Sequence, residues 1–131
     1  MKHFTITELC SSDTAMSAGI KNLPNIEQTS NLIALVNNVL DPLREQYGKP
    51  IHVNSGFRCD ALNKKVGGAA TSQHVRGQAA DITGGSREEN QKLFELCKSL
   101  PFDQLINEYD FKWIHVSFKK AGNRKQILKI G

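Results

Sequence analysis

The sequence lacks the long apolar segments that membrane proteins and secreted precursors carry. Its mean hydropathy is −0.40, and no apolar run approaches the roughly 18 residues that a membrane-spanning helix needs. The stretch from Met1 to Thr5 contains no apolar core of a signal peptide. We therefore expect no membrane association, and a protein that is either cytoplasmic or phage-encoded and released at lysis. With 131 residues the chain suits one domain, residues 1–131, and leaves little room for two.

Cysteine is scarce, and its distribution does not form a disulfide framework. The three cysteines, Cys10, Cys59 and Cys97, are odd in number and widely spaced. None belongs to a Cys-x-x-Cys pair. We therefore expect reduced, small thiols in the protein interior.

Charge of neither sign dominates the sequence. Lys and Arg total 17 against 13 for Asp and Glu, which gives a net charge of +4. The densest basic group lies near the C-terminus and contains Lys119, Lys120, Arg124, Lys125 and Lys129. A solvated surface explains this group, and weak attraction to a polyanion such as an acidic cell-wall polymer is the alternative. We do not expect nucleic acid as a partner.

The first fifty residues carry helix signals. Thr5 and Glu8 form the spacing of a capping box, in which both side chains satisfy free amides at a helix start. Apolar residues at three- and four-residue steps predict a long helix over 26–47. Pro42 interrupts this helix, because it has no amide hydrogen and clashes with the preceding turn. The helix is expected to kink there, or to stop and restart with Asp41 as its cap.

The remaining residues mix strands and helices. Strands are predicted over 51–57, 78–83, 104–109, 113–118 and 126–130, the third and fourth forming a hairpin and the last lying at an edge. Shorter helices are predicted over 60–66 and from the capping box Ser86–Glu89 to about residue 99. Helices first and neighbouring strands later predict an α+β fold, with N-terminal helices packed on a mostly antiparallel sheet.

Two histidines and an aspartate stand out as candidate metal ligands. His74 and Asp81 lie seven residues apart in a run of small residues that lets the backbone bend, so both side chains could converge. Alternation along 113–118 directs His115 away from the core. Two histidines and one carboxylate suffice for one catalytic zinc ion (Zn2+), which keeps its fourth position for a water with a pKa near 7. The alternative is that His74 and His115 are unrelated surface or hydrogen-bonded histidines.

Four short blocks carry a resemblance to a known family. They are Ser55-Gly-Phe-Arg58, Asn63-x-x-Val66-Gly-Gly-Ala69, Ser72-x-His74-x-x-Gly77-x-Ala79-x-Asp81 and Trp113-Ile-His115-Val-Ser117. In order and spacing they resemble the peptidase M15 family, and in particular its M15A-like branch of zinc D-Ala-D-Ala carboxypeptidases and phage cell-wall endopeptidases. The resemblance implies zinc ligands at His74, Asp81 and His115, a hedgehog/DD-peptidase-like fold, and peptidoglycan stem peptides as substrates.

Three further residues are candidates for contact with a substrate. The Arg58 guanidinium can hold a substrate carboxylate or steady an oxyanion, and the family assigns the arginine of this block to the substrate. A structural salt bridge is the alternative for Arg58. Ser72 is expected to contact substrate, or, like Gln73, to orient the His74 loop or complete the hydrogen bonding of its imidazole. Trp113 is expected in the wall of the cleft.

The general base is the part of the site where the sequence departs from the family. In several members a carboxylate stands three residues before the last zinc histidine, and here that position is Lys112. If Glu108 pairs with Trp113 across the predicted hairpin, Glu108 shares the face of His115 as a diagonal neighbour. Glu108 is therefore our candidate base, and Asp110, expected in the turn, is the alternative.

The sequence thus predicts a monomeric zinc metallopeptidase that hydrolyses peptide bonds in peptidoglycan stem peptides. The sequence does not decide whether the enzyme is a D-Ala-D-Ala carboxypeptidase or an endolysin-type endopeptidase. It also does not decide between a phage and a bacterial origin. The alternative is a non-catalytic, zinc-containing module of the same fold that binds peptide or cell wall, an interpretation that Lys112 favours.

Overall fold

The computed structural model describes residues 1–131, and its N-terminal part begins with two short helices. Helix α1 covers Ile6–Cys10, and α2 covers Asp13–Ala18. Thr5 accepts a hydrogen bond from the Glu8 amide at 3.1 Å, as predicted, but the return bond from the Thr5 amide to the Glu8 side chain does not form, so only half of the predicted capping box is present. None of the helices has both the length and the apolar character needed to cross a bilayer.

The predicted long helix is present, and it changes its winding before the proline. It consists of three consecutive segments, α3 (Ile26–Leu35), the π-helical η1 (Val36–Leu40) and α4 (Asp41–Tyr47). Asp41 is itself helical and donates its amide to the Val36 carbonyl, so the predicted restart with Asp41 as a cap is wrong. The π-helical segment ends two residues before Pro42. Pro42 has no amide hydrogen to donate to the preceding turn, and the wider π-helical turn accommodates this missing hydrogen bond.

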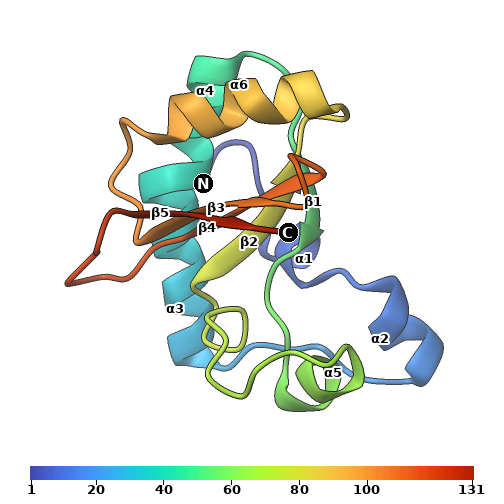
Figure 1. The fold of residues 1–131 in the computed structure, drawn as a ribbon. Coiled ribbons are helices and arrows are strands. Elements are labelled where there is room, and N and C mark those ends of the chain that lie inside the picture. Colours follow the sequence, from blue (N-terminus) through green and yellow to red (C-terminus); the bar gives the residue numbers. More distant parts are fainter.

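A mixed sheet of five strands forms the second half of the fold (Figure 1). Its strands are β1 (His52–Ser55), β2 (Ala79–Thr83), β3 (Gln104–Glu108), β4 (Trp113–Ser117) and β5 (Gln126–Ile130), in the order β1-β2-β4-β3-β5. The pairs β1–β2, β2–β4 and β3–β4 are antiparallel, and β5 runs parallel to β3. The predicted α+β fold with a mostly antiparallel sheet is confirmed, with β5 at its edge.

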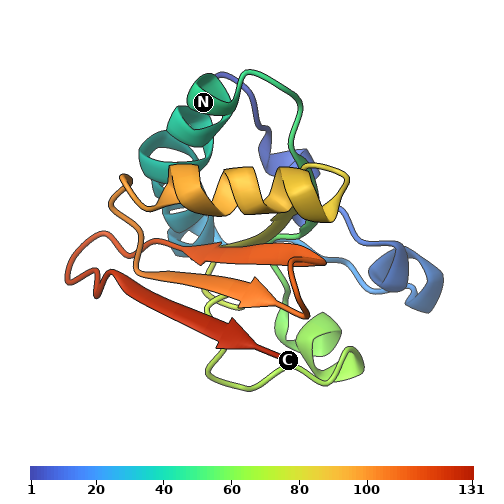
Figure 2. The same cartoon turned by 45° about the horizontal axis from the view of Figure 1, so that its top comes forward.

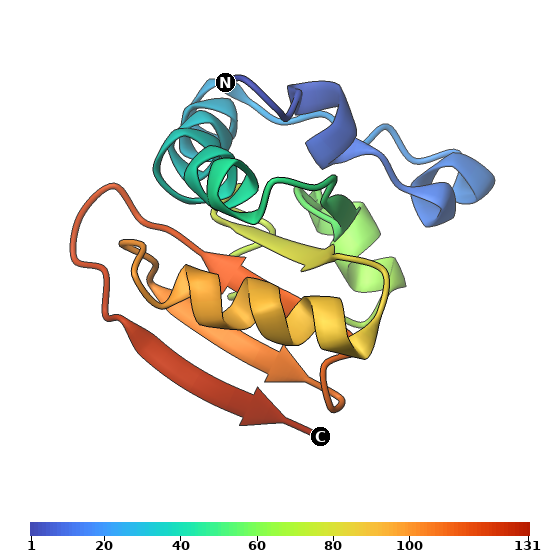
Figure 3. The same ribbon diagram turned by 90° about the horizontal axis from the view of Figure 1, so that it is seen from above.

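Two further helices lie on opposite sides of the sheet. Helix α6 (Arg87–Cys97) crosses above the strands, whereas α5 (Asp60–Lys65) and the loop after it lie below them (Figure 1). Figure 2 shows β5 at the outer edge of the sheet. Seen from above, this edge is the one farthest from the N-terminal helices (Figure 3). The lower face of the sheet is thus the face that α5 and its loop approach.

A single hydrophobic cluster of 22 buried residues fills the space between the helices and the upper face of the sheet. On β4, Ile114 and Val116 are fully buried in this cluster. Because side chains alternate along a strand, His115 is directed to the lower face, as predicted. Ile106 on β3 pairs with His115 and is buried outside the cluster, which places it on the same lower face.

The three cysteines form no disulfide bond. Cys97 is fully buried in α6, and burial raises the pKa of its thiol to about 12. Cys10 and Cys59 are partly exposed. All three cysteines pack with the hydrophobic cluster, but the prediction of thiols in the interior holds for Cys97 alone.

Candidate metal centre

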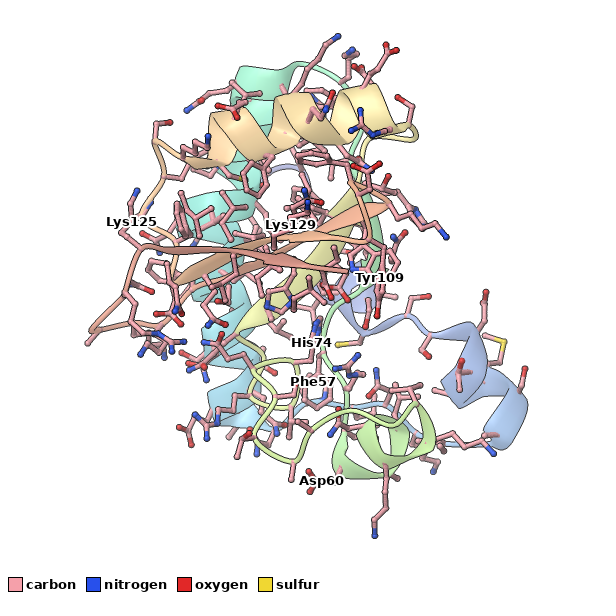
Figure 4. All side chains as sticks on the ribbon, viewed as in Figure 1. Phe57, Asp60, His74, Tyr109, Lys125 and Lys129 are labelled. Atoms are coloured by element: carbon pink, nitrogen blue, oxygen red, sulfur yellow. The ribbon has the colours of Figure 1, made fainter.

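The three predicted ligands come together on the lower face of the sheet. The candidate ligand atoms of His74, Asp81 and His115 all lie within 4.8 Å of one another. Asp81 on β2 and His115 on β4 are paired directly across the ladder. His74 comes from the loop before β2 and lies below the strands (Figure 4). Asp81 Oδ1 lies 3.0 Å from His115 Nδ1 and 3.4 Å from His74 Nε2. Backbone pairing therefore positions two of the three groups.

The imidazole of His74 is held by a carbonyl that the sequence analysis did not single out. His74 Nδ1 lies 2.7 Å from the Gly56 carbonyl oxygen, which leaves Nε2 directed at Asp81. Metal-binding histidines commonly donate their second ring N–H to such an acceptor. Ser72 contributes differently, because its hydroxyl accepts from the His74 amide at 3.2 Å. The expectation that Ser72 or Gln73 serves the imidazole is wrong, although Ser72 does orient the loop.

The loop that carries His74 is fastened to α3. Gln28 donates to the Val75 carbonyl at 3.0 Å, and Asn31 donates to the Arg76 carbonyl at 2.9 Å. Gly77 has a φ of +75°, and a Cβ there would stand 2.5 Å from the Gln28 carbonyl oxygen. Only glycine fits this close approach of loop and helix. Gly77, one of the small residues noted in the sequence, is therefore needed for the loop that brings His74 toward β2.

The donor set fits a zinc ion. Two imidazoles and one carboxylate are the ligands of a catalytic zinc with three protein donors, and the side chains of His74, Asp81 and His115 are 4%, 15% and 12% exposed. Burial by itself would raise the pKa of Asp81, but hydrogen bonds from His115 and His74 outweigh it and hold this pKa well below its usual range. Asp81 is thus an anion in a largely dry site, which favours a cation there.

Arg58 lies beside this cluster and is not used in a salt bridge. Its Nη2 donates to Ser72 Oγ at 3.2 Å, while its Nε is buried without a partner in the chain. Burial lowers the pKa of Arg58, and the carboxylates of Asp81 and Glu108 oppose this shift. The structural salt bridge considered for Arg58 is therefore absent, and its guanidinium keeps free donors near both acids.

Asn22 supports Arg58 from a loop far away in sequence. Its amide nitrogen donates to the Cys10 carbonyl at 2.9 Å and the Phe57 carbonyl at 2.8 Å. Its amide oxygen accepts from the Cys59 backbone at 2.8 Å. The buried Asn22 side chain thereby ties the residues on both sides of Arg58. Nothing local marks Asn22 for this role, because an asparagine in a loop reads as a turn residue.

Glu108 lies on the same face of the sheet as His115. The predicted pairing of Glu108 with Trp113 is confirmed, and Ile106 pairs with His115 on the same two strands. The Trp113 indole N–H donates to Glu108 Oε2 at 3.0 Å. Trp113 therefore orients the acid in addition to lining its surroundings.

Asp110 occupies the β3–β4 turn, and its carboxylate binds Arg87 outside the candidate metal centre. Arg87 donates to both of its carboxylate oxygens, at 3.1 and 2.9 Å, and the Asp110 side chain is 69% exposed. The turn has three successive left-handed residues, Tyr109 to Phe111. Buried Asn90 donates to the carbonyls of Phe111 and Lys112 and so fixes this turn. Lys112 itself donates its amide to the Glu108 carbonyl at 3.1 Å.

Comparison with known proteins agrees with this geometry. The family model described as peptidase M15 matches residues 2–117. A 49-residue segment is 49% identical to the zinc D-Ala-D-Ala carboxypeptidase of Streptomyces albus G. This segment covers 37% of the chain and spans only 19% of the length of that relative. Because the family match extends over most of the residues, including all three of the clustered ligands, the chain belongs to the peptidase M15 family.

Proposed function

We propose that this protein is a zinc-dependent peptidase that hydrolyses peptide bonds in peptidoglycan stem peptides. The observation that carries the proposal is the cluster of His74, Asp81 and His115, flanked by Arg58, which forms no salt bridge, and by Glu108, which Trp113 orients. Membership in the peptidase M15 family supports the peptidase activity. The similar Streptomyces albus G protein is a zinc D-Ala-D-Ala carboxypeptidase, which supports zinc and the D-Ala-D-Ala class of substrate.

His74, Asp81 and His115 would hold the metal. When bound, zinc polarises the scissile carbonyl and lowers the pKa of the attacking water to about 7. Asp81 balances the charge of the cation, and the Gly56 carbonyl keeps the His74 imidazole in the orientation that presents Nε2. The chain thus supplies a preformed set of three donors.

Glu108 acts as the general base in this proposal. It accepts a proton from the attacking water and returns it to the leaving amine. Its place beside His115 and its hydrogen bond from Trp113 favour it over Asp110, whose carboxylate binds Arg87 in the exposed turn. Arg58 holds a substrate carboxylate, or stabilises the negative charge that develops on the carbonyl oxygen. Ser72 keeps the guanidinium in place.

A non-catalytic zinc-containing module that binds peptide or cell wall is the second candidate. The observation that favours it is Lys112, which stands where several family members carry a carboxylate. The two candidates differ in one measurable respect, because both bind zinc but only the peptidase releases products.

The released products also distinguish the two possible peptidase activities. Carboxypeptidase action releases single terminal D-Ala residues, whereas endopeptidase action releases larger fragments.

The test compares wild type with Glu108→Gln on purified peptidoglycan, with mass spectrometry of the released fragments. We expect wild type to release product, a metal chelator to stop the release, and Glu108→Gln to stop it while retaining one zinc per chain. Asp110→Asn is the matched control and should remain active. Release that survives complete metal removal, or full activity of Glu108→Gln, would contradict the mechanism. Zinc binding without any release supports the binding module.

A further inference from the structure

Asp103 is a fully buried carboxylate that lies outside the candidate centre. It stands directly before β3, and its backbone amide donates to the Ser117 carbonyl at 2.7 Å. Arg124 donates to Asp103 Oδ1 from Nε at 3.0 Å and to Oδ2 from Nη2 at 2.7 Å, and Lys119 Nζ lies 3.7 Å from Oδ1. The Gln73 side-chain amide donates to Oδ2 at 3.0 Å. Asp103 therefore links the C-terminal segment to the His74 loop.

Gln73 is the residue that transmits this link. It directly precedes His74, and its backbone carbonyl accepts from the amides of Arg76 and Gln78, at 3.1 and 3.0 Å. Its side chain thus fastens the loop to the start of β3, while its main chain shapes the turn that carries the imidazole. The Gly56 carbonyl holds the His74 ring from another direction. A displacement of Gln73 therefore moves the backbone of His74, and with it the Nε2 atom that would bind the metal.

The basic partners of Asp103 lie in a part of the chain that the family match does not include. The match ends at residue 117, and Arg124 and Lys119 follow it. A buried carboxylate destabilises the fold unless its oxygens are paired. Hydrogen bonds from Arg124 hold the pKa of Asp103 well below its usual range, against the effect of burial. The C-terminal segment thus keeps Asp103 ionised, as an acceptor for Gln73.

We propose that Asp103 and Gln73 are positioning residues for the metal ligand His74, and that Arg124 of the C-terminal segment keeps them in place. The inference rests on the proposed function, since it takes His74 as a zinc ligand. It predicts that breaking the Gln73–Asp103 hydrogen bond weakens zinc binding without removing any ligand. Groups that hydrogen-bond to metal-bound histidines typically contribute a factor of ten to a hundred to metal affinity. Gln73 acts on the backbone next to His74 and not on the imidazole itself.

The test uses Gln73→Met, which breaks the hydrogen bond to Asp103 without changing any charge, and Arg124→Met, which removes the bidentate partner of the buried Asp103 carboxylate. Lys125→Met is the matched control. Lys125 lies in the same segment and donates to the carbonyls of Lys98 and Leu100, but it does not contact Asp103. Zinc affinity is measured by competition with a chromophoric chelator. The visible spectrum of the cobalt-substituted protein reports the ligand geometry, and the melting temperature of the metal-free protein reports stability.

We expect about tenfold weaker zinc binding and an altered cobalt spectrum in Gln73→Met and Arg124→Met, and neither change in Lys125→Met. A lower melting temperature with unchanged zinc affinity and cobalt spectrum would show that Asp103 only fastens β5, and would overturn the inference. Failure of the wild type to bind zinc would instead refute the proposed function. The two failures are therefore distinguishable.

Discussion

Asp81 and His115 face each other directly across strands β2 and β4, with Asp81 Oδ1 3.0 Å from His115 Nδ1. Their neighbours Ile82 and Ile114 form the next pair in the ladder and are fully buried on the opposite face. A slip of one residue in this register would turn over the side chains of the slipped strand, so that one of the two ligands would face the core. The apolar packing of the upper face therefore also sets the geometry of the metal centre.

Zinc should stabilise the fold, because it binds the assembled ligands and not the unfolded chain. At a free zinc concentration of one hundred times the dissociation constant, the gain is about 2.7 kcal/mol, or about 10 °C in melting temperature. His115→Ala should lose most of this shift. Thermal unfolding followed by circular dichroism, with and without zinc, measures it.

His52→Ala is the control for that experiment, because His52 is an exposed histidine on β1 outside the cluster. Its zinc-dependent shift should equal that of the wild type. An equal shift in His115→Ala would show that zinc binds elsewhere on the chain.

Gly56→Ala should disturb both stability and zinc binding. An added Cβ would stand 2.2 Å from the Leu9 carbonyl oxygen, which also accepts a hydrogen bond from the Phe57 amide. Such overpacking costs about 3 kcal/mol, and the Gly56 carbonyl that holds His74 shifts with it. Urea unfolding of the metal-free protein, together with a zinc titration, checks both effects.

Gly67→Ala provides the comparison for Gly56→Ala. Gly67 has a φ of +75° and nothing within 4 Å of an added Cβ. The only cost there is that alanine adopts the left-handed backbone conformation less readily than glycine, which amounts to about 1 kcal/mol. Zinc affinity should not change. Equal zinc affinity in the two variants would argue against a role for the Gly56 carbonyl.

Trp113→Phe should slow turnover without removing the metal. The substitution keeps an aromatic ring but deletes the indole N–H that donates to Glu108 at 3.0 Å. A hydrogen bond to a charged group is worth about 1.5–3 kcal/mol, so we expect kcat to fall about tenfold or more, with zinc content unchanged. Steady-state kinetics on muropeptides measures this.

Tyr109→Phe is the matched variant for Trp113→Phe. The Tyr109 ring lies 5.3 Å from the Trp113 ring, centroid to centroid, and its side chain makes no hydrogen bond to Glu108. Its kcat should stay close to that of the wild type. If both variants lost activity equally, packing of the aromatic pair and not the orientation of Glu108 would be the cause.

Acid should weaken the fold partly through Glu89. Contacts with Lys49, Lys92 and Tyr47 lower the pKa of Glu89 to about 2. Because the folded pKa lies below the unfolded one, the stabilising contribution is complete above about pH 5 and disappears as the pH falls toward 2. Glu89→Gln should therefore be less stable than the wild type at pH 7, and the difference should narrow between pH 5 and pH 3.

Urea unfolding at several pH values tests this expectation. Glu95→Gln is the control, because Glu95 is 68% exposed and pairs only with Lys98 across one helical turn. Exposed pairs of this kind contribute little to stability. A stability difference between Glu89→Gln and wild type that does not change with pH would contradict the assignment.

Much of the site could be read from the sequence because its signals are local. Alternation in β4 directs His115 away from the core, and the hairpin register places Glu108 beside Trp113. The spacing of the blocks was sufficient to identify the family, which the match over residues 2–117 confirms. Helix starts at Thr5 and Ser86 were also readable, since capping depends on a few adjacent residues.

The tertiary structure alone decided which distant groups serve these residues. Gly56 presents a carbonyl to His74, Asn22 clamps the flanks of Arg58, and Asp103 holds Gln73. The parallel pairing of β5 with β3 was also beyond local patterns. The physical reason is common to all of them. Each of these bonds joins segments that are far apart in the sequence, so the choice of partner depends on how the packed elements bring those segments together.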